Sequence, residues 1–135
     1  MGTLRTLMRA HALAIPFENL EIVLGRPVLL GVADLEAKMV RARRGGYCYE
    51  HVLLFGAVLE RLGFGVTGLS ARVRMGTGAV RSATHALLLA EPADDERPWL
   101  CDVGFGRGQL APVPLADGAE TTGERWVRDR RSSVG

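Results

Sequence analysis

The hydrophobic pattern of this chain changes its period once, at Gly63. Before that glycine, apolar residues recur every three or four positions over residues 3–15, 33–42 and 48–62, the spacing of one helix face. After it, apolar and polar residues alternate, as in strands that bury one side. Helices gathered in the first half and strands in the second predict an α+β fold rather than a parallel sheet with crossover helices. We therefore expect a helical bundle followed by an antiparallel sheet or barrel.

Several stretches after Gly63 have the pattern of strands. Apolar side chains alternate with arginines over residues 71–75, which predicts a half-buried strand. The other strand-like stretches are Phe64–Leu69, Thr84–Ala90 and Trp99–Gly104. Glycines 65 and 68 predict a bend or bulge in the first of these. The acidic segment Glu91–Pro98 is expected to be the loop between the last two strands.

Composition narrows the class of protein. The chain has 135 residues, 47% of them apolar, which is enough to bury a core and excludes a disordered chain. We expect a helical domain over residues 1–63, an antiparallel β domain over 64–115 and a poorly packed tail over 116–135. A net charge of +2 is too small to indicate nucleic acid or an anionic membrane as a partner.

Two further features of the sequence bear on the cellular compartment of the protein. There is no run of 18 apolar residues, so we expect no membrane span. The N-terminus lacks the pattern of a secretory signal, so the two cysteines, Cys48 and Cys101, are expected to be free thiols rather than a disulfide. These features predict a cytoplasmic protein.

Cys48 is the first candidate for chemistry. It follows Gly45 and Gly46 and opens the predicted helix 48–62. The positive end of a helix dipole favours the thiolate form, and two glycines allow a sharp turn that leaves the sulfur accessible. The alternative is that Cys48 is a small buried apolar residue on the helix face.

His85 and Asp102 supply what a thiolate nucleophile needs, a base and a group that orients the base. If the strands around Glu91–Pro98 form a hairpin in which Leu89 pairs with Pro98, His85 lies opposite Asp102 on one face. A slip by one residue would send Asp102 to the other face. The alternatives are a core histidine and a surface carboxylate, but the apolar neighbours of Asp102 argue for burial.

Other constellations are weaker. Cys48 and His51 have the spacing of half a zinc site, but a structural zinc needs four ligands, and no finger-like set is present, so we expect no metal. His51 is expected to face solvent, away from the nucleophile. Residues 104–108 are rich in glycine but lack the Lys-Ser/Thr of a phosphate-binding loop.

Four blocks of sequence occur together in this chain. They are Ile15–Leu20 (IPFENL), Arg44–His51 (RGGYCYEH), Thr84–His85 and Asp102–Gly106 (DVGFG). In order and spacing they resemble the arylamine N-acetyltransferase family, over roughly residues 4–115. The resemblance implies a cysteine-proteinase-like fold with Cys48 as nucleophile, His85 as base and Asp102 as the orienting carboxylate.

The same resemblance implies a reaction and its supporting residues. An acetyl group would pass from acetyl-CoA to an arylamine or hydrazine nitrogen through a thioester on the cysteine. Phe105, Val73 and Gly104 would be substrate-binding residues. Glu18 would pair with Arg44 and brace the loop before the nucleophile, since a buried Arg and a buried Glu each need the other.

The chain also differs from that family. Its members usually carry a third, C-terminal lid domain, which we expect this chain to lack, and Val52 stands where they usually have Asn. Two alternatives to the acetyltransferase follow: an amide synthase with the same triad, or a non-catalytic remnant. Apolar surface left open by a missing lid predicts a homo-oligomer.

Overall fold

A computed structural model describes residues 2–73, 78, 80–106 and 109–116. Its helices are α1 (Gly2–Ala14), α2 (Leu20–Val23), α3 (Val32–Leu35), the π-helical η1 (Glu36–Arg41) and α4 (Cys48–Arg61). Its strands are β1 (Gly65–Ala71), β2 (His85–Glu91), β3 (Trp99–Cys101) and β4 (Val113–Pro114). Helices precede strands, as predicted for an α+β fold. The domain limits at residues 63 and 115 stay predictions, and the predicted tail lies outside the described residues beyond Ala116.

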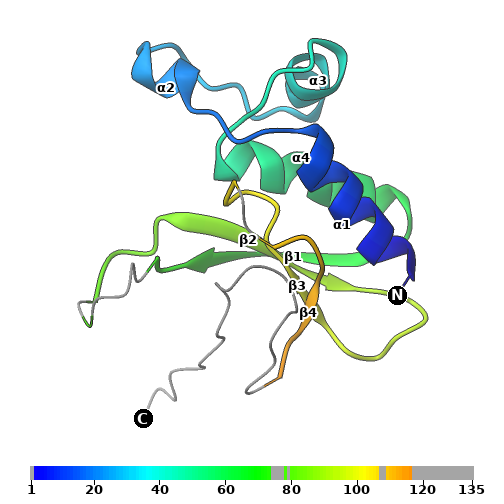
Figure 1. Ribbon diagram of the computed structural model, residues 1–135. Coiled ribbons are helices and arrows are strands. Elements are labelled where there is room, and N and C mark those ends of the chain that lie inside the picture. Colours follow the sequence, from blue (N-terminus) through cyan, green and yellow to red (C-terminus); the bar gives the residue numbers. More distant parts are fainter. Residues whose placement is uncertain (1, 74–77, 79, 107–108, 117–135) are drawn as a thin grey trace.

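The strands form one antiparallel sheet in the order β1-β2-β3-β4, so each strand pairs with its neighbour in sequence. Figure 1 shows α1 and α4 above one face of this sheet, with α2 and α3 farther from it. Helix α4 contacts both β1 and β2. This arrangement brings the start of α4 to the end of the sheet where β2 begins.

The main core lies between α1, α4 and the helix-facing side of the sheet. Alternate residues of β2 point into it, because successive side chains of a strand point to opposite faces. Its buried members are Leu4, Met8, Cys48, Val52, Phe55, Leu59, Ala86, Leu88, Ala90, Trp99, Cys101 and Val103. A smaller cluster of Leu35, Met39 and Leu54 joins α3 and η1 to the other side of α4.

Three local predictions were wrong. β1 pairs with β2 without a break from Gly65 to Ala71, so the expected bend is absent there, because both glycines keep their place in the ladder. The strand expected over 71–75 ends at Ala71; Arg72 and Val73 are not in a strand, and residues 74–77 lie outside the described part. Leu62, the last residue of the helix predicted over residues 48–62, lies just beyond α4, which ends at Arg61, and is 54% exposed.

In the part of the chain that the structure describes, every helix is too short or too polar to cross a membrane.

Candidate active site

Cys48 is the first residue of α4 and is 7% exposed. Its sulfur lies 4.0 Å from the carbonyl oxygen of Thr84, the residue that precedes β2. Gly104 lies against its backbone: a Cβ at residue 104 would come 2.7 Å from the Cα of Cys48, so a side chain there would force the two segments apart. The fold therefore brings the start of α4, the start of β2 and the loop after β3 together around one thiol.

His85 and Asp102 form a hydrogen-bonded pair beside that thiol. The Nε2 atom of His85 lies 2.9 Å from both carboxylate oxygens of Asp102. Since a carboxylate can only accept, Nε2 carries the proton and donates. Within the described residues, the other ring nitrogen, Nδ1, has no hydrogen-bond partner. A neutral imidazole held in this way offers Nδ1 as a base.

The hairpin register differs from the predicted one by two residues. Leu89 pairs with Leu100 rather than with Pro98. Pro98 has no N–H to donate to the ladder, so pairing with β2 begins at Trp99. Extended along the strands, this register sets Asp102 diagonal to His85 rather than opposite it. A shift of two keeps both residues on the same face, and the His85 ring reaches the Asp102 carboxylate across the diagonal.

A cleft of about 330 Å³ opens beside these residues. It is lined by Phe17, Asn19, Ile22, Tyr47, Cys48, Val73, Thr84, His85, Gly104 and Phe105. Phe105 stands edge-on to the His85 ring, with 5.1 Å between ring centroids, and is 45% exposed. Val73, Gly104 and Phe105, named from the sequence as substrate-binding residues, thus lie at one cleft with Cys48 and His85. Sequence reasoning missed Phe17, Asn19 and Ile22, although the first two belong to the Ile15–Leu20 block.

Cys101 has different surroundings. It is fully buried in the core, on the face of β3 opposite to the side of Asp102. Burial, with a smaller contribution from the Asp102 charge, raises the pKa of the Cys101 thiol to about 12. Both cysteines are free thiols in the structure, as expected.

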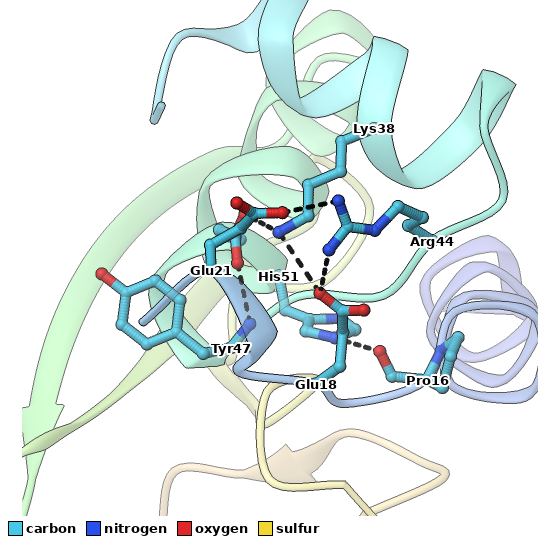
Figure 2. Close-up of polar contacts among 8 residues, drawn as sticks. Pro16, Glu18, Glu21, Lys38, Arg44, Tyr47 and His51 are labelled. Carbon is cyan, nitrogen blue, oxygen red and sulfur yellow. Dashed lines mark hydrogen bonds and ion pairs between the residues drawn. The ribbon is translucent and has the colours of Figure 1, made fainter. Parts of the chain in front are cut away.

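A network of charged side chains lies behind the loop that precedes Cys48 (Figure 2). Arg44 donates to Glu18 at 2.9 Å and to Glu21 at 2.6 Å. Lys38 donates to Glu50 at 2.7 Å and lies 3.5 Å from Glu18. The hydrogen bond from Arg44 lowers the pKa of Glu21. We call these five residues, Glu18, Glu21, Lys38, Arg44 and Glu50, the charged network.

The pairing of Glu18 with Arg44 was foreseen, but the rest of the charged network was not. Arg44 is 39% exposed at its side chain, whereas the side chain of Glu50 is 3% exposed and that of Lys38 is 17% exposed. Glu50 also accepts the backbone N–H of Tyr47 at 3.0 Å, at the start of α4. The more deeply buried pair is therefore Lys38 with Glu50. The signal available in the sequence was that Lys38 is the only lysine of the chain.

The glycines before Cys48 allow close approach rather than a sharp turn. A Cβ at Gly45 would collide with the carbonyl oxygen of Pro16. Phe17 and Gly46 form a parallel bridge, with the Glu18 N–H donating to the Gly46 carbonyl at 2.9 Å. The Ile15–Leu20 block is thus packed directly on the loop that carries Cys48.

His51 is buried, not solvated as predicted. It is 1% exposed and lies one helical turn before Phe55, and its ring contacts that of His11 in α1, with 5.1 Å between ring centroids. Its Nε2 lies 3.1 Å from the Pro16 carbonyl oxygen, and its Nδ1 lies 2.8 Å from Nε2 of His11. Burial lowers the pKa of His51, and burial together with the His51 charge lowers the pKa of His11 to about 4.

The described residues contain no group of three or more His, Cys, Asp or Glu side chains placed to hold a metal ion. A second hollow of about 270 Å³, beside Leu62 and Phe64, is lined by no cysteine or histidine among those residues. Of these two hollows, the one at Cys48 brings a thiol and an imidazole together.

Comparison with known proteins gives close matches. A profile of the N-acetyltransferase family matches residues 1–131. The arylamine N-acetyltransferase of Mycolicibacterium smegmatis is 49% identical over 120 residues, covering 85% of this chain and 43% of that protein. The crystal structure of the Nocardia farcinica arylamine N-acetyltransferase is 62% identical, with a TM-score of 0.83 over 87% of this chain and 41% of its own.

A third similar protein was solved with a ligand. The Mycobacterium marinum arylamine N-acetyltransferase in complex with CoA is 42% identical, with a TM-score of 0.81 over 87% of this chain and 45% of its own. The likeness to these structures confirms the predicted cysteine-proteinase-like α+β fold. The chain spans less than half the length of the relatives it matches.

Proposed function

This chain belongs to the arylamine N-acetyltransferase family, and from that premise we propose that it transfers an acetyl group from acetyl-CoA to the nitrogen of an arylamine or hydrazine. The observation that carries the proposal is the His85–Asp102 pair, whose His85 ring lines the same cleft as Cys48. The CoA complex of the Mycobacterium marinum relative supports acetyl-CoA as the donor.

The proposed reaction has two halves, each with a balanced proton transfer. In the first, Nδ1 of His85 takes the thiol proton of Cys48, and the thiolate attacks the carbonyl carbon of acetyl-CoA. The bond to the CoA sulfur breaks, and the CoA thiolate leaves with the proton from His85. An acetyl thioester on Cys48 remains.

In the second half, the amine nitrogen attacks the thioester carbonyl while His85 takes the amine proton. The Cys48 thiolate leaves and recovers that proton, and the acetylated amine is released. Throughout, Asp102 accepts from Nε2 of His85, which fixes the tautomer and stabilises the imidazolium when it forms. Phe105, packed edge-on against His85, and Val73 would form the wall against which an aromatic acceptor lies.

Intact mass spectrometry after incubation with acetyl-CoA tests the proposal. We expect a gain of one acetyl group, absent in Cys48→Ala and retained in Cys101→Ala, the matched control. We also expect the gain to slow by at least about a hundredfold in His85→Gln, because the base is lost. An unchanged mass in the parent, or acetylation that persists in Cys48→Ala, would contradict the proposal.

Two finer expectations remain part of the proposal. A nucleophilic thiol needs a reducing compartment, which supports the cytoplasm as its location. The expected homo-oligomer stays a prediction, which sedimentation of the purified chain would test; a monomer at all concentrations would contradict it.

A further inference from the structure

The carbonyl oxygen of Pro16 accepts two hydrogen bonds. One comes from the backbone N–H of Gly46 at 3.3 Å, and the other involves Nε2 of His51 at 3.1 Å. Figure 2 shows the contact between the His51 ring and Pro16. His51 therefore connects α4 to the paired backbones of Pro16–Glu18 and Gly46, two residues before the nucleophile.

The protons on the two histidines follow from this geometry. A carbonyl oxygen can only accept, so Nε2 of His51 donates. In a neutral imidazole the other nitrogen then carries a lone pair, so Nδ1 of His51 accepts from Nε2 of His11 at 2.8 Å. Burial keeps both rings neutral near pH 7, since it lowers the pKa of each. The result is a directed chain from His11 through His51 to Pro16.

The first turn of α4 thus holds the nucleophile loop through two neighbouring side chains. Glu50 accepts the N–H of Tyr47 and is paired with Lys38 on the side of the charged network. His51 holds Pro16 on the side that α1 covers. Between them lie Gly45–Tyr47, so the position of Cys48 relative to the rest of the cleft depends on both.

We propose that His51 is a positioning residue for Cys48 and that His11 keeps it in the required tautomer. The effect of His51 on acetyl transfer rests on the proposed function, whereas its effect on the backbone around Gly46 does not. Removing the hydrogen bond to Pro16 loosens the bridge between Phe17 and Gly46 and lets Cys48 move within the cleft. Misplacement of a reacting group by about 1 Å costs up to a hundredfold in rate.

Two substitutions separate positioning from simple packing. In His51→Gln, the side-chain amide retains a donor for Pro16 and an acceptor for His11; in His51→Leu, both are lost. We expect amide hydrogen exchange at Gly46 and Glu18 to quicken by roughly tenfold in His51→Leu, with little change in His51→Gln. Amides of β2 serve as an internal reference, and Leu53→Gln, on the exposed face of α4, serves as the matched control.

Alkylation of Cys48 by iodoacetamide gives the functional readout without acetyl-CoA. We expect the rate to fall by about tenfold in His51→Leu and to recover in His51→Gln. Equal losses in both variants, or no change in either, would overturn the proposal. If His51→Leu does not fold, His11→Leu decides: faster exchange at Gly46 supports the proposal and unchanged exchange overturns it. A protein that fails to acquire an acetyl group but shows these effects would contradict the proposed function alone.

Discussion

Cys48 and Cys101 are both buried, yet they lie in different kinds of interior. Around Cys48 are an imidazole paired with a carboxylate, an open cleft and, one turn along α4, two residues that bond to the preceding loop. Around Cys101 are apolar side chains from α1, α4 and the sheet, and its sulfur contacts only the carbonyl of Trp99 at 3.9 Å among the hydrogen-bond acceptors of the described residues.

Burial alone therefore does not define the surroundings of a thiol. What matters is whether the buried space also holds a base, a route for a substrate and groups that fix the backbone. An apolar interior stabilises the fold through packing, whereas polar groups that are shielded from solvent need hydrogen-bond or ion-pair partners. The charged network and the two histidines meet that need beside Cys48.

The largest expected effect is in thiol reactivity. With its pKa raised to about 12, Cys101 holds about a thousandfold less thiolate at pH 7 than a thiol of ordinary acidity. Limiting iodoacetamide should therefore alkylate Cys48, which lines the cleft, in strong preference to the buried thiol of Cys101, as measured by peptide mass mapping. Comparable labelling of both cysteines in the folded protein would break the comparison.

The next effect concerns the free energy of unfolding. Lys38→Met leaves the carboxylate of Glu50 buried without its cation, so we expect a loss of about 3–4 kcal/mol in urea denaturation. Arg44→Met should cost less, because the Arg44 side chain is partly exposed. Arg41→Met is the control: the Arg41–Glu36 pair is exposed and should contribute little. Equal losses at Lys38 and Arg41 would show that the buried charges beside Cys48 are unimportant.

The smallest expected effect is the pH dependence of the free energy of unfolding. The pKa of His11 is about 4 and that of His51 is lowered, whereas both are near 6.5 in the unfolded chain. The unfolded chain thus binds more protons between about pH 4 and 6.5, so stability falls as pH falls through that window, by about 2 kcal/mol. Glu50 and Lys38 also act on His51, with opposite signs.

Denaturation midpoints measured from pH 7 to pH 4 would detect this loss. A His11→Asn/His51→Gln variant should lose much of the dependence, since its side chains do not titrate there. If that variant loses the same stability between pH 7 and pH 4, other titrating groups cause the effect.

Much of the fold follows from local pattern. The hydrophobic periodicity predicted the ends of α1 and α4 to within a residue or two. Each helix buries one face, and the apolar residues of that face recur at helical spacing in its own sequence. Strands β2 and β3 were found in the same way, although β3 is shorter than expected. The sequence also predicted that His85 and Asp102 share a face of the sheet, since strand side chains alternate between faces with a period of two residues.

What failed required knowledge of neighbours. The hairpin register was wrong by two residues because it depends on how Glu91–Pro98 closes. There Asp95 accepts the backbone N–H of Arg97 at 3.0 Å and the indole N–H of Trp99 at 3.2 Å. His51 was predicted to face solvent because the sequence of α4 alone does not show that α1 packs over it.

Local sequence pattern was enough to predict the helical and stranded halves and the residue types able to act at the cleft, whereas the pairing of Glu18 with Arg44 came from the family resemblance. Which polar groups are buried together follows instead from the packing of distant elements: Lys38 with Glu50, and His11 with His51. The physical reason is that periodicity records what each element buries, whereas a contact between distant elements depends on their packing angle and register. Those are set by the whole core rather than by any one segment.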